Sequence, residues 1–251
     1  MNGLRENVFM LQFDGSGGSS WMRTESVETA PHAQWGVAVL VALDGVVRVE
    51  GREGTAEGPV VVVPADLEHV SSARGPVVSV LLDADLHRDA AVTVRRVKPF
   101  RVAEPSLVTA AQSTAKGSVL SLPGAASVMA SRILPLGNGT THAVRDARLA
   151  ALVRAPEKAE TVSLRSLASR LDLSPGHAST LFHAHVGISF RRWQLWRRLM
   201  RAIPYLRPGG LAHAAQEAGF ADQAHLSRTC ARLLGYTPRT LAALGSIVRA
   251  R

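Results

Sequence analysis

The first half of the sequence contains one cluster of residues that could take part in metal or acid–base chemistry. The segment Pro64-Ala-Asp-Leu-Glu-His69 places a carboxylate, Glu68, beside an imidazole, His69. A catalytic metal site needs more ligands than these two, and no His-x-His pair occurs in this part of the chain. We therefore expect no bound metal, no cofactor and no catalytic residue, and we predict that the protein is not an enzyme.

Two further patterns each lack a partner that their chemistry would need. His183 and His185 are two positions apart, and on a helix such residues point about 200° apart, so they cannot share one ion. The stretch Gly15-Ser-Gly-Gly18 lacks the lysine and the following helix of a phosphate-binding loop. Cys230, the single cysteine, cannot form an intrachain disulfide, and its apolar helical surroundings favour a buried structural role.

The positive charge of the chain is concentrated in its second part. Residues 1–142 hold 12 Lys and Arg against 14 Asp and Glu, whereas residues 143–251 hold 17 against 6, which is a net charge of +11. This asymmetry indicates that one part meets a polyanion while the other has a different task. The sequence has no apolar run long enough to span a bilayer and does not start like a secretory signal, so we expect a cytoplasmic protein.

The first hundred residues have the pattern of a small β-barrel or sandwich. Short apolar segments separated by glycine and proline are typical of barrel strands. The predicted strands cover residues 35–43, 46–50, 60–63 and 77–82. Asp44-Gly45 lies between the first two strands and predicts a tight hairpin turn. The segment Pro135-Leu-Gly-Asn-Gly-Thr-Thr141 interrupts regular structure and predicts a linker.

Helical patterns follow the barrel. Residues 105–116 and 123–134 favour helix before the linker, and after it the whole chain has helical periodicity, beginning with residues 146–154. The predicted organisation is a barrel over residues 1–103, a helical segment that could dimerise over 104–134, a linker over 135–142 and a helical domain over 143–251. The predicted fold class is therefore a two-domain α+β protein.

The basic part contains an internal repeat. The apolar residues of the segment that begins at Leu164 match those of the segment that begins at Leu211, at an offset of 47 positions. After the turn the offset is 48, as between Gly187 and Gly235. Each copy has the layout of a helix-turn-helix motif, whose second helix enters the major groove of DNA. The repeat therefore predicts two DNA-reading units.

Local signals predict the ends of these helices. Ser174-Pro175 and Thr237-Pro238 each combine an N-cap residue with a first-turn proline. Asp172 and Gly219 fall in the two turns and can adopt a left-handed conformation.

The amphipathic segment 189–206 lies between the two copies and should set their separation. Two recognition helices that enter adjacent major grooves must lie about 34 Å apart. Pro204 lacks an amide donor and clashes one turn back, so this connecting helix should end or kink between Met200 and Pro204.

The segment from about Asp146 to Leu244 resembles the DNA-binding domain of the AraC/XylS family of bacterial transcriptional regulators. Its most diagnostic portion is AAQEAGFADQAHLSRTCARLLGYTP, and the first copy matches through LASRLDLSPGHASTLF and GISFRRWQLWRRLMRA. The resemblance implies helix-turn-helix motifs over residues 163–186 and 211–234, joined by a connecting helix over 189–206. It also implies promoter DNA as a partner, and RNA polymerase if the protein is an activator.

The resemblance also assigns DNA contacts to side chains of this domain. Expected base contacts are Gln223, His225, Arg228, His177, Ser179 and Thr180. Expected phosphate contacts are Arg191, Arg192, Arg197, Arg198, Arg232 and Arg239. Because the family often has a larger side chain where Gly176 and Thr180 stand, the second recognition helix should carry more of the base readout. For the two histidines a capping or packing role is an open alternative, and for the arginines solvation of an exposed face.

The strand pattern WGVAVLVALDGVVRVEG followed by GPVVVVPADLEHV resembles the cupin-type sensor barrel that precedes this DNA-binding domain in many family members. It implies a small-molecule effector and a homodimer. The candidate effector-binding residues are His32, Trp35 and His69. Two alternatives remain open: a constitutive DNA-binding regulator whose barrel only dimerises, and a cupin metalloenzyme fused to a DNA-binding domain.

Overall fold

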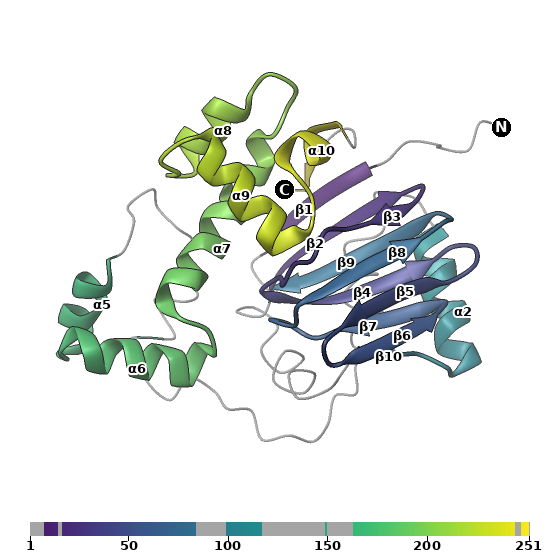
Figure 1. Cartoon of the computed structure of the whole chain (residues 1–251), viewed down its shortest axis with the longest axis horizontal. Coiled ribbons are helices and arrows are strands. Elements are labelled where there is room, and N and C mark those ends of the chain that lie inside the picture. Colours follow the sequence, from purple (N-terminus) through teal and green to yellow (C-terminus); the bar gives the residue numbers. More distant parts are fainter. Residues whose placement is uncertain are drawn as a thin grey trace.

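The structure is a computed structural model that describes residues 8–14, 17–83, 99–116, 149, 163–243 and 247–250. Two β-sheets form the N-terminal part, and a group of short helices forms the C-terminal part (Figure 1). Helices α5 and α6 extend away from the sheets, whereas α9 and α10 lie beside one end of them (Figure 1). This α+β arrangement confirms the predicted fold class.

The N-terminal part is a pair of packed sheets. Its strands are β1 (Val8–Asp14), β2 (Gly17–Thr24), β3 (Val27–Glu28), β4 (Gly36–Ala42), β5 (Val47–Gly51), β6 (Gly54–Gly58), β7 (Val60–Val63), β8 (His69–Ala73), β9 (Val77–Asp83), β10 (Phe100–Arg101) and β11 (Ile247–Ala250). A seven-stranded sheet has the order β10-β7-β4-β9-β2-β1-β11, and a four-stranded sheet has the order β3-β8-β5-β6. The pairings are antiparallel except for that of β1 with β11, which is parallel. This architecture of two antiparallel sheets agrees with the small β-barrel or sandwich that the sequence predicts.

Strand β4 explains how the two sheets pack. All of its residues are buried, because alternate side chains point to opposite faces and both faces are covered. Leu40 packs with Val47 and Val49 of the smaller sheet. Val39 belongs to the cluster on the other face, which includes Ala111 of helix α2 (Pro105–Lys116). The predicted helix over 105–116 is thus confirmed, and it covers the outer face of the larger sheet.

The predicted hairpin at Asp44-Gly45 is wrong. Strand β4 pairs with β7 and β9, whereas β5 pairs with β6 and β8, so the chain passes from one sheet to the other at this point. Gly45 does adopt a positive φ of 74°. The physical reason lies in the two strands: β4 is apolar on both faces and suits a doubly covered sheet, whereas β5 alternates and suits a sheet with one face in water.

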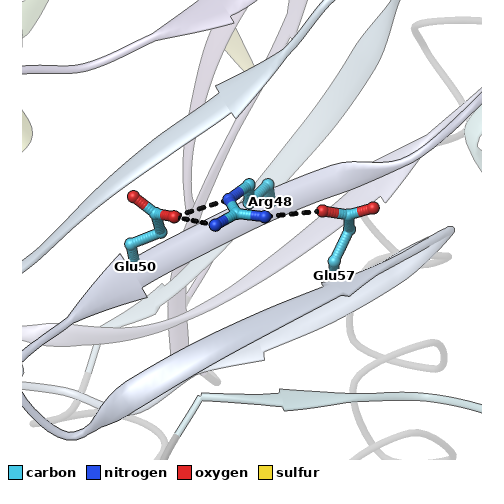
Figure 2. A network of polar contacts seen from close by, with 3 residues as sticks. All are labelled: Arg48, Glu50 and Glu57. Carbon is cyan, nitrogen blue, oxygen red and sulfur yellow. Dashed lines mark hydrogen bonds and ion pairs between the residues drawn. The ribbon is translucent and has the colours of Figure 1, made fainter.

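The water-facing side of the smaller sheet carries a group of three charged residues (Figure 2). Arg48 of β5 contacts Glu50 on its own strand and Glu57 on β6, with a distance of 3.2 Å from Arg48 Nη1 to Glu57 Oε2. Hydrogen bonds to these carboxylates raise the pKa of the Arg48 guanidinium above its ordinary value. Because all three side chains are about half exposed, solvent screens the attraction. Their main effect is to favour the register in which Arg48 lies opposite Glu57.

The C-terminal part consists of two helical pairs and a connecting helix. Its helices are α5 (Leu164–Leu171), α6 (Pro175–Val186), α7 (Phe190–Ala202), the 3-10 turn η2 (Ile203–Tyr205), α8 (Leu211–Glu217), α9 (Gln223–Leu234) and α10 (Pro238–Ala243). Helix α7 ends at Ala202 and Pro204 lies in η2, which confirms the predicted end of the connecting helix.

The predicted caps are also observed. Ser174 Oγ accepts a hydrogen bond from the amide of His177, and Thr237 Oγ1 accepts one from the amide of Thr240. Asp172 has a φ of 55° and Gly219 a φ of 73°, so both turns use the left-handed conformation. Local sequence signals therefore determine where these helices begin and end.

Three predicted segments lie outside the described residues: the helices over 123–134 and 146–154, apart from the buried helical residue Leu149, and the linker over 135–142. The division into domains accordingly stays a prediction. The expectation that the whole chain after the linker is helical is wrong at its end, because residues 247–250 form strand β11, which pairs with β1 of the N-terminal sheet. Among the helices that the structure describes, none is long and apolar enough to cross a membrane.

Candidate nucleic-acid interface and effector site

The two helical pairs are built alike around a shared aromatic core. Phe182 of α6 contacts Phe190 and Trp193 of α7, with ring centroids 5.1 and 5.4 Å apart. Trp196 of α7 is fully buried, as is Cys230 of α9, which stands at the repeat position of Phe182. Burial raises the pKa of the Cys230 thiol to about 12, so this cysteine acts as a small apolar side chain. Helix α7 therefore connects the two units through its buried face.

Helix α9 has one face buried in the core and one face that is accessible. Leu226 and Leu233 are buried, whereas Gln223 is partly exposed and Arg228 is exposed. The His225 amide donates a hydrogen bond of 2.6 Å to Asp222 Oδ1, and its ring lies edge-on to Phe220 at 5.2 Å. The structure thus gives His225 the packing role that the sequence left open. Its contact with a base, like those of Gln223 and Arg228, stays a prediction.

The accessible face of helix α6 carries shorter side chains than that of α9. His177 and Thr180 are exposed and Ser179 is partly exposed. The Thr180 hydroxyl donates to the carbonyl of Gly176 at 3.2 Å, which directs it back onto its own helix. A Cβ added at Gly176 would meet no atom within 4 Å, so this position is open to a larger side chain.

The six candidate phosphate-binding arginines have different surroundings. Arg191, Arg232 and Arg239 are exposed, and Arg197 and Arg198 are partly exposed. The guanidinium of Arg197 lies 5.9 Å from the centre of the Trp193 ring. Arg192 instead reaches the barrel, where its Nη1 is 2.5 Å from Asp66 Oδ1 and its Nη2 donates to the carbonyl of Ala33 at 3.1 Å. The structure therefore places Arg192 between the two parts of the molecule.

A short barrel segment, residues 29–34, lies against the C-terminal end of α9; we call it the docking strap. The Ala30 amide donates to the carbonyl of Gly235 at 3.0 Å, and the Ala33 amide donates to that of Arg232 at 3.1 Å. These bonds satisfy carbonyls that a helix end leaves without intrahelical partners.

Gly235 is constrained twice at this contact. Its φ of 73° is the left-handed conformation of a helix C-cap, which glycine adopts without strain. A Cβ at this position would also lie 2.7 Å from His32 Nδ1 and 2.8 Å from Thr29 Cβ. The glycine of the second repeat thus permits both the end of α9 and the approach of the docking strap.

Two of the three candidate effector residues form a buried pair. The ring centroids of His32 and His69 are 4.3 Å apart, and their backbones exchange hydrogen bonds of 3.0 and 2.9 Å. Burial, with the neighbouring His69, lowers the pKa of His32 to about 4, and burial also lowers the pKa of His69. Both imidazoles are therefore neutral at pH 7. Trp35 is also buried, and it belongs to the hydrophobic core cluster that includes Val37 and Val39 of β4.

His32 and His69 line a cavity of about 90 Å³ between the barrel and the helical part. Ile203, Leu234 and Tyr236 contribute its helical side. Gln34 also lines the barrel side; it is 3% exposed, and neither Oε1 nor Nε2 has a hydrogen-bond partner among the described residues. An unsatisfied buried amide costs about 1–3 kcal/mol.

The sequence did not identify Gln34 or the helical wall of the cavity. No local pattern marks Gln34, since a glutamine beside Trp35 reads equally well as a surface residue. The wall residues Ile203 and Leu234 read as helix core. Among the described residues no group of three His, Cys, Asp or Glu could hold a metal ion.

The C-terminal helices match a known protein domain family. A helix-turn-helix domain family matches residues 167–243, which span α8 and α9 entirely and most of the first unit. Residues 167–243 are a helix-turn-helix domain of the AraC type. The AraC-type domain therefore contains the exposed faces of α6 and α9 described above. None of the curated proteins matches the chain.

Solved structures share the whole architecture. ToxT from Vibrio cholerae superposes with a TM-score of 0.56 at 11% identity, over 92% of this chain and 100% of that chain. ToxT with a bound unsaturated fatty acid superposes with a TM-score of 0.51 at 12% identity, over 97% of this chain and 96% of that chain. At these identities the likeness establishes a common fold, in which an AraC-type domain follows a two-sheet domain. The family match and the common fold together indicate that the helical part contains a DNA-binding domain.

Proposed function

We propose that this protein is a sequence-specific DNA-binding transcriptional regulator whose activity depends on a small molecule bound at its N-terminal barrel. The observation that carries the proposal is the AraC-type domain, in which two similar helix-turn-helix units are held by one connecting helix. The net charge of +11 over residues 143–251 supplies the attraction for the DNA backbone.

Base readout is assigned mainly to the second unit. Arg228 is exposed on the face of α9 opposite Leu226, where a guanidinium can pair bidentately with guanine. The first unit offers a short Thr180 side chain and no side chain at Gly176. It therefore helps to position the domain on the DNA more than it distinguishes between bases. The remaining base contacts, His177, Ser179, Gln223 and His225, belong to the same proposal.

Control by a small molecule has two supports. The cavity beside the docking strap is lined by both parts of the molecule, and ToxT, which shares the fold, has been solved with a bound unsaturated fatty acid. Because the cavity is formed by both parts of the molecule, a ligand there would alter the contact between them. Cytoplasmic location, a homodimer and contact with RNA polymerase are the further elements of this proposal.

Footprinting on the DNA upstream of the protein's own gene tests DNA binding by the purified full-length chain. We expect protection whose affinity falls by about 10³-fold or more between 50 and 200 mM salt, as for about six phosphate contacts. Arg228→Ala should weaken the specific site by about 1–3 kcal/mol. Arg74→Ala, which removes an exposed arginine from the barrel, is the control and should leave protection unchanged. Absence of protection, or equal effects of the two variants, would refute the proposal.

A further inference from the structure

The cavity between the barrel and the AraC-type domain extends between the two β-sheets. Residues that pair directly in antiparallel strands lie on the same face of a sheet. Ser79 of β9 pairs with Leu40 of β4, which packs against the smaller sheet, so the Ser79 side chain also points between the sheets. From the smaller sheet, Ser71 of β8 pairs with the inward-facing Val49 and lines the same cavity. The cavity is therefore a space inside the barrel that the helical part closes at one end.

Ser79 carries a hydroxyl group that a molecule in this cavity can reach. Its backbone pairs with β2 on one side and with β4 on the other. Ser79 is nevertheless partly exposed, whereas its neighbours Val78 and Val80 are buried. The accessible surface of Ser79 therefore belongs to its side chain, which lines the cavity. A serine hydroxyl can both donate and accept a hydrogen bond.

The cavity admits only a small molecule. Its volume is about 90 Å³, which is less than the roughly 150 Å³ of an engineered cavity that binds benzene. We therefore expect an occupant of about four or five non-hydrogen atoms. Part of this room exists because Ala38 and Ser79 have short side chains on the inner face of the larger sheet.

The lining of the cavity carries no charge at neutral pH. The described residues that line it include no Lys, Arg, Asp or Glu. Burial lowers the pKa of both lining histidines, His32 and His69, so neither imidazole is a cation at pH 7. A carboxylate in this cavity would lose its hydration without gaining a counter-charge, which is costly. Because most of the lining is apolar, as at Leu40, Ile203 and Leu234, the cavity favours an uncharged ligand with an apolar body.

We propose that this cavity binds a short-chain alcohol of about four or five non-hydrogen atoms, whose hydroxyl group forms a hydrogen bond with Ser79. The inference rests on the proposed function, because it names the class of effector for the same regulator. An alcohol fits because its hydroxyl pairs with that of Ser79 whichever of the two donates. Its alkyl chain packs against Leu40 of the barrel and against Ile203 and Leu234 of the helical part, so both parts of the molecule contact it.

An NMR titration of the full-length protein at pH 7.5 tests the ligand class. The probes are two pairs of an alcohol and a carboxylate with equal numbers of non-hydrogen atoms: 1-propanol with acetate, and 1-butanol with propionate. We expect at least one alcohol to shift the methyl signals of Ala38 and Leu40 with an about millimolar dissociation constant, and its carboxylate to bind at least about tenfold more weakly. The inference is overturned if a carboxylate binds as tightly as its alcohol, or if neither alcohol gives saturable shifts up to about 0.1 M.

Ser79→Ala identifies the recognising residue. This variant keeps the room in the cavity but lacks the hydroxyl, so the affinity for the alcohol should fall about three- to tenfold. Ser72→Ala is the matched control and should bind like the parent, because Ser72 of β8 pairs with Arg48 on the water-facing side of the smaller sheet. Unchanged alcohol affinity in a folded Ser79→Ala protein overturns the assignment of Ser79.

Ala38→Leu tests the location of the site independently of Ser79. The larger side chain would occupy the cavity from β4, so binding followed through the Leu40 signals should be lost. Ala38→Val is the smaller change that serves if the leucine variant does not fold, and it should weaken binding at least about tenfold. Full alcohol affinity in a folded variant at this position overturns the placement of the ligand.

DNA footprinting on the same preparations separates this inference from the proposed function. If the parent protects DNA but binds no alcohol, the ligand assignment fails and the regulator stands. If the parent binds the alcohol but protects no DNA, the regulator fails and the binding site stands.

Discussion

Arg192 of α7 and Asp66 of the loop between β7 and β8 form an ion pair between the two parts of the molecule, with 2.5 Å from Nη1 to Oδ1. The same guanidinium donates to the carbonyl of Ala33 in the docking strap. The sequence assigns Arg192 to a DNA phosphate, so the barrel and the DNA would compete for one side chain. If Arg192 contacts DNA as the sequence predicts, the barrel contact would couple the arrangement of the two parts to DNA affinity.

Removing the carboxylate of Asp66 should therefore strengthen DNA binding. Because the pair is partly exposed, its worth is at most about 1 kcal/mol, and Asp66→Ala should raise DNA affinity about two- to fivefold in a fluorescence anisotropy titration. Glu68→Ala removes an exposed carboxylate from the same loop and is the matched control. Equal affinity gains in the two variants would show that loss of negative charge alone is responsible.

Gly235→Ala should disturb the contact between α9 and the docking strap. A left-handed conformation costs a non-glycine residue about 1–2 kcal/mol, and the new methyl group would also lie within 3 Å of His32 and Thr29. Gly209→Ala is the control, since Gly209 has nearly the same φ of 74° but no atom within 4 Å of its Cβ position. In urea unfolding, the free energy of unfolding should fall further for Gly235→Ala than for Gly209→Ala. Equal losses would mean that the docking strap can move away from the new methyl group without a further loss in the free energy of unfolding.

The stability of the protein should fall as the pH drops from about 6.5 toward 4. The folded-state pKa of His32 is about 4, whereas an unfolded histidine has a pKa near 6.5, so in this window the unfolded chain binds the proton more readily. The contribution of His32 is fully present above pH 6.5 and is lost by about 3 kcal/mol as the pH approaches 4.

Urea unfolding at pH 7, 5.5 and 4.5 measures this loss. His32→Gln should show a smaller loss than the parent, with part of the slope remaining because the pKa of His69 is also lowered. His183→Gln, at an exposed site on α6, should keep the slope of the parent. If the free energy of unfolding of His32→Gln depends on pH as steeply as that of the parent, other groups are responsible for the pH dependence.

Gly176 offers a way to strengthen the weaker recognition helix. Gly176→Ala should stabilise the protein by about 0.5–1 kcal/mol, because the position is helical and its Cβ meets no neighbour. Gly176→Lys should add to this a cation on the first turn of α6 and steepen the dependence of log affinity on log salt by about 0.9. If the alanine and lysine variants have the same salt dependence, α6 does not approach the DNA backbone at this turn.

The helices could be predicted well because their signals are local. Ser174-Pro175, Thr237-Pro238 and Pro204 each determine a helix end through atoms within one turn. Strand partners depend on distant residues, so no local pattern indicated that β1 pairs with β11 or that β4 and β5 belong to different sheets. Alternation along β5 was the available signal that the two strands belong to different sheets.

The candidate sites also differ in how well the sequence predicts them. The accessible face of α9 follows from helical periodicity, and the exposed position of Arg228 agrees with it. The cavity depends on the packing of two parts that are remote in sequence, which is why His32 and His69 could be proposed but Gln34, Ile203 and Leu234 could not. Trp35 was a reasonable candidate by type, but its depth in the core depends on the strand pairing.

Strand β11 has a mechanical consequence for regulation. Residues 163–243 are flanked in sequence by the barrel and its helix α2 on one side and by a strand of the same barrel on the other. The pairing of β11 with β1 therefore ties the C-terminal end of these helices to the sheet. A large movement of these helices must either keep β11 paired with β1 or break the hydrogen bonds between these two strands. The pairing at this edge of the sheet therefore limits how far the helices can move.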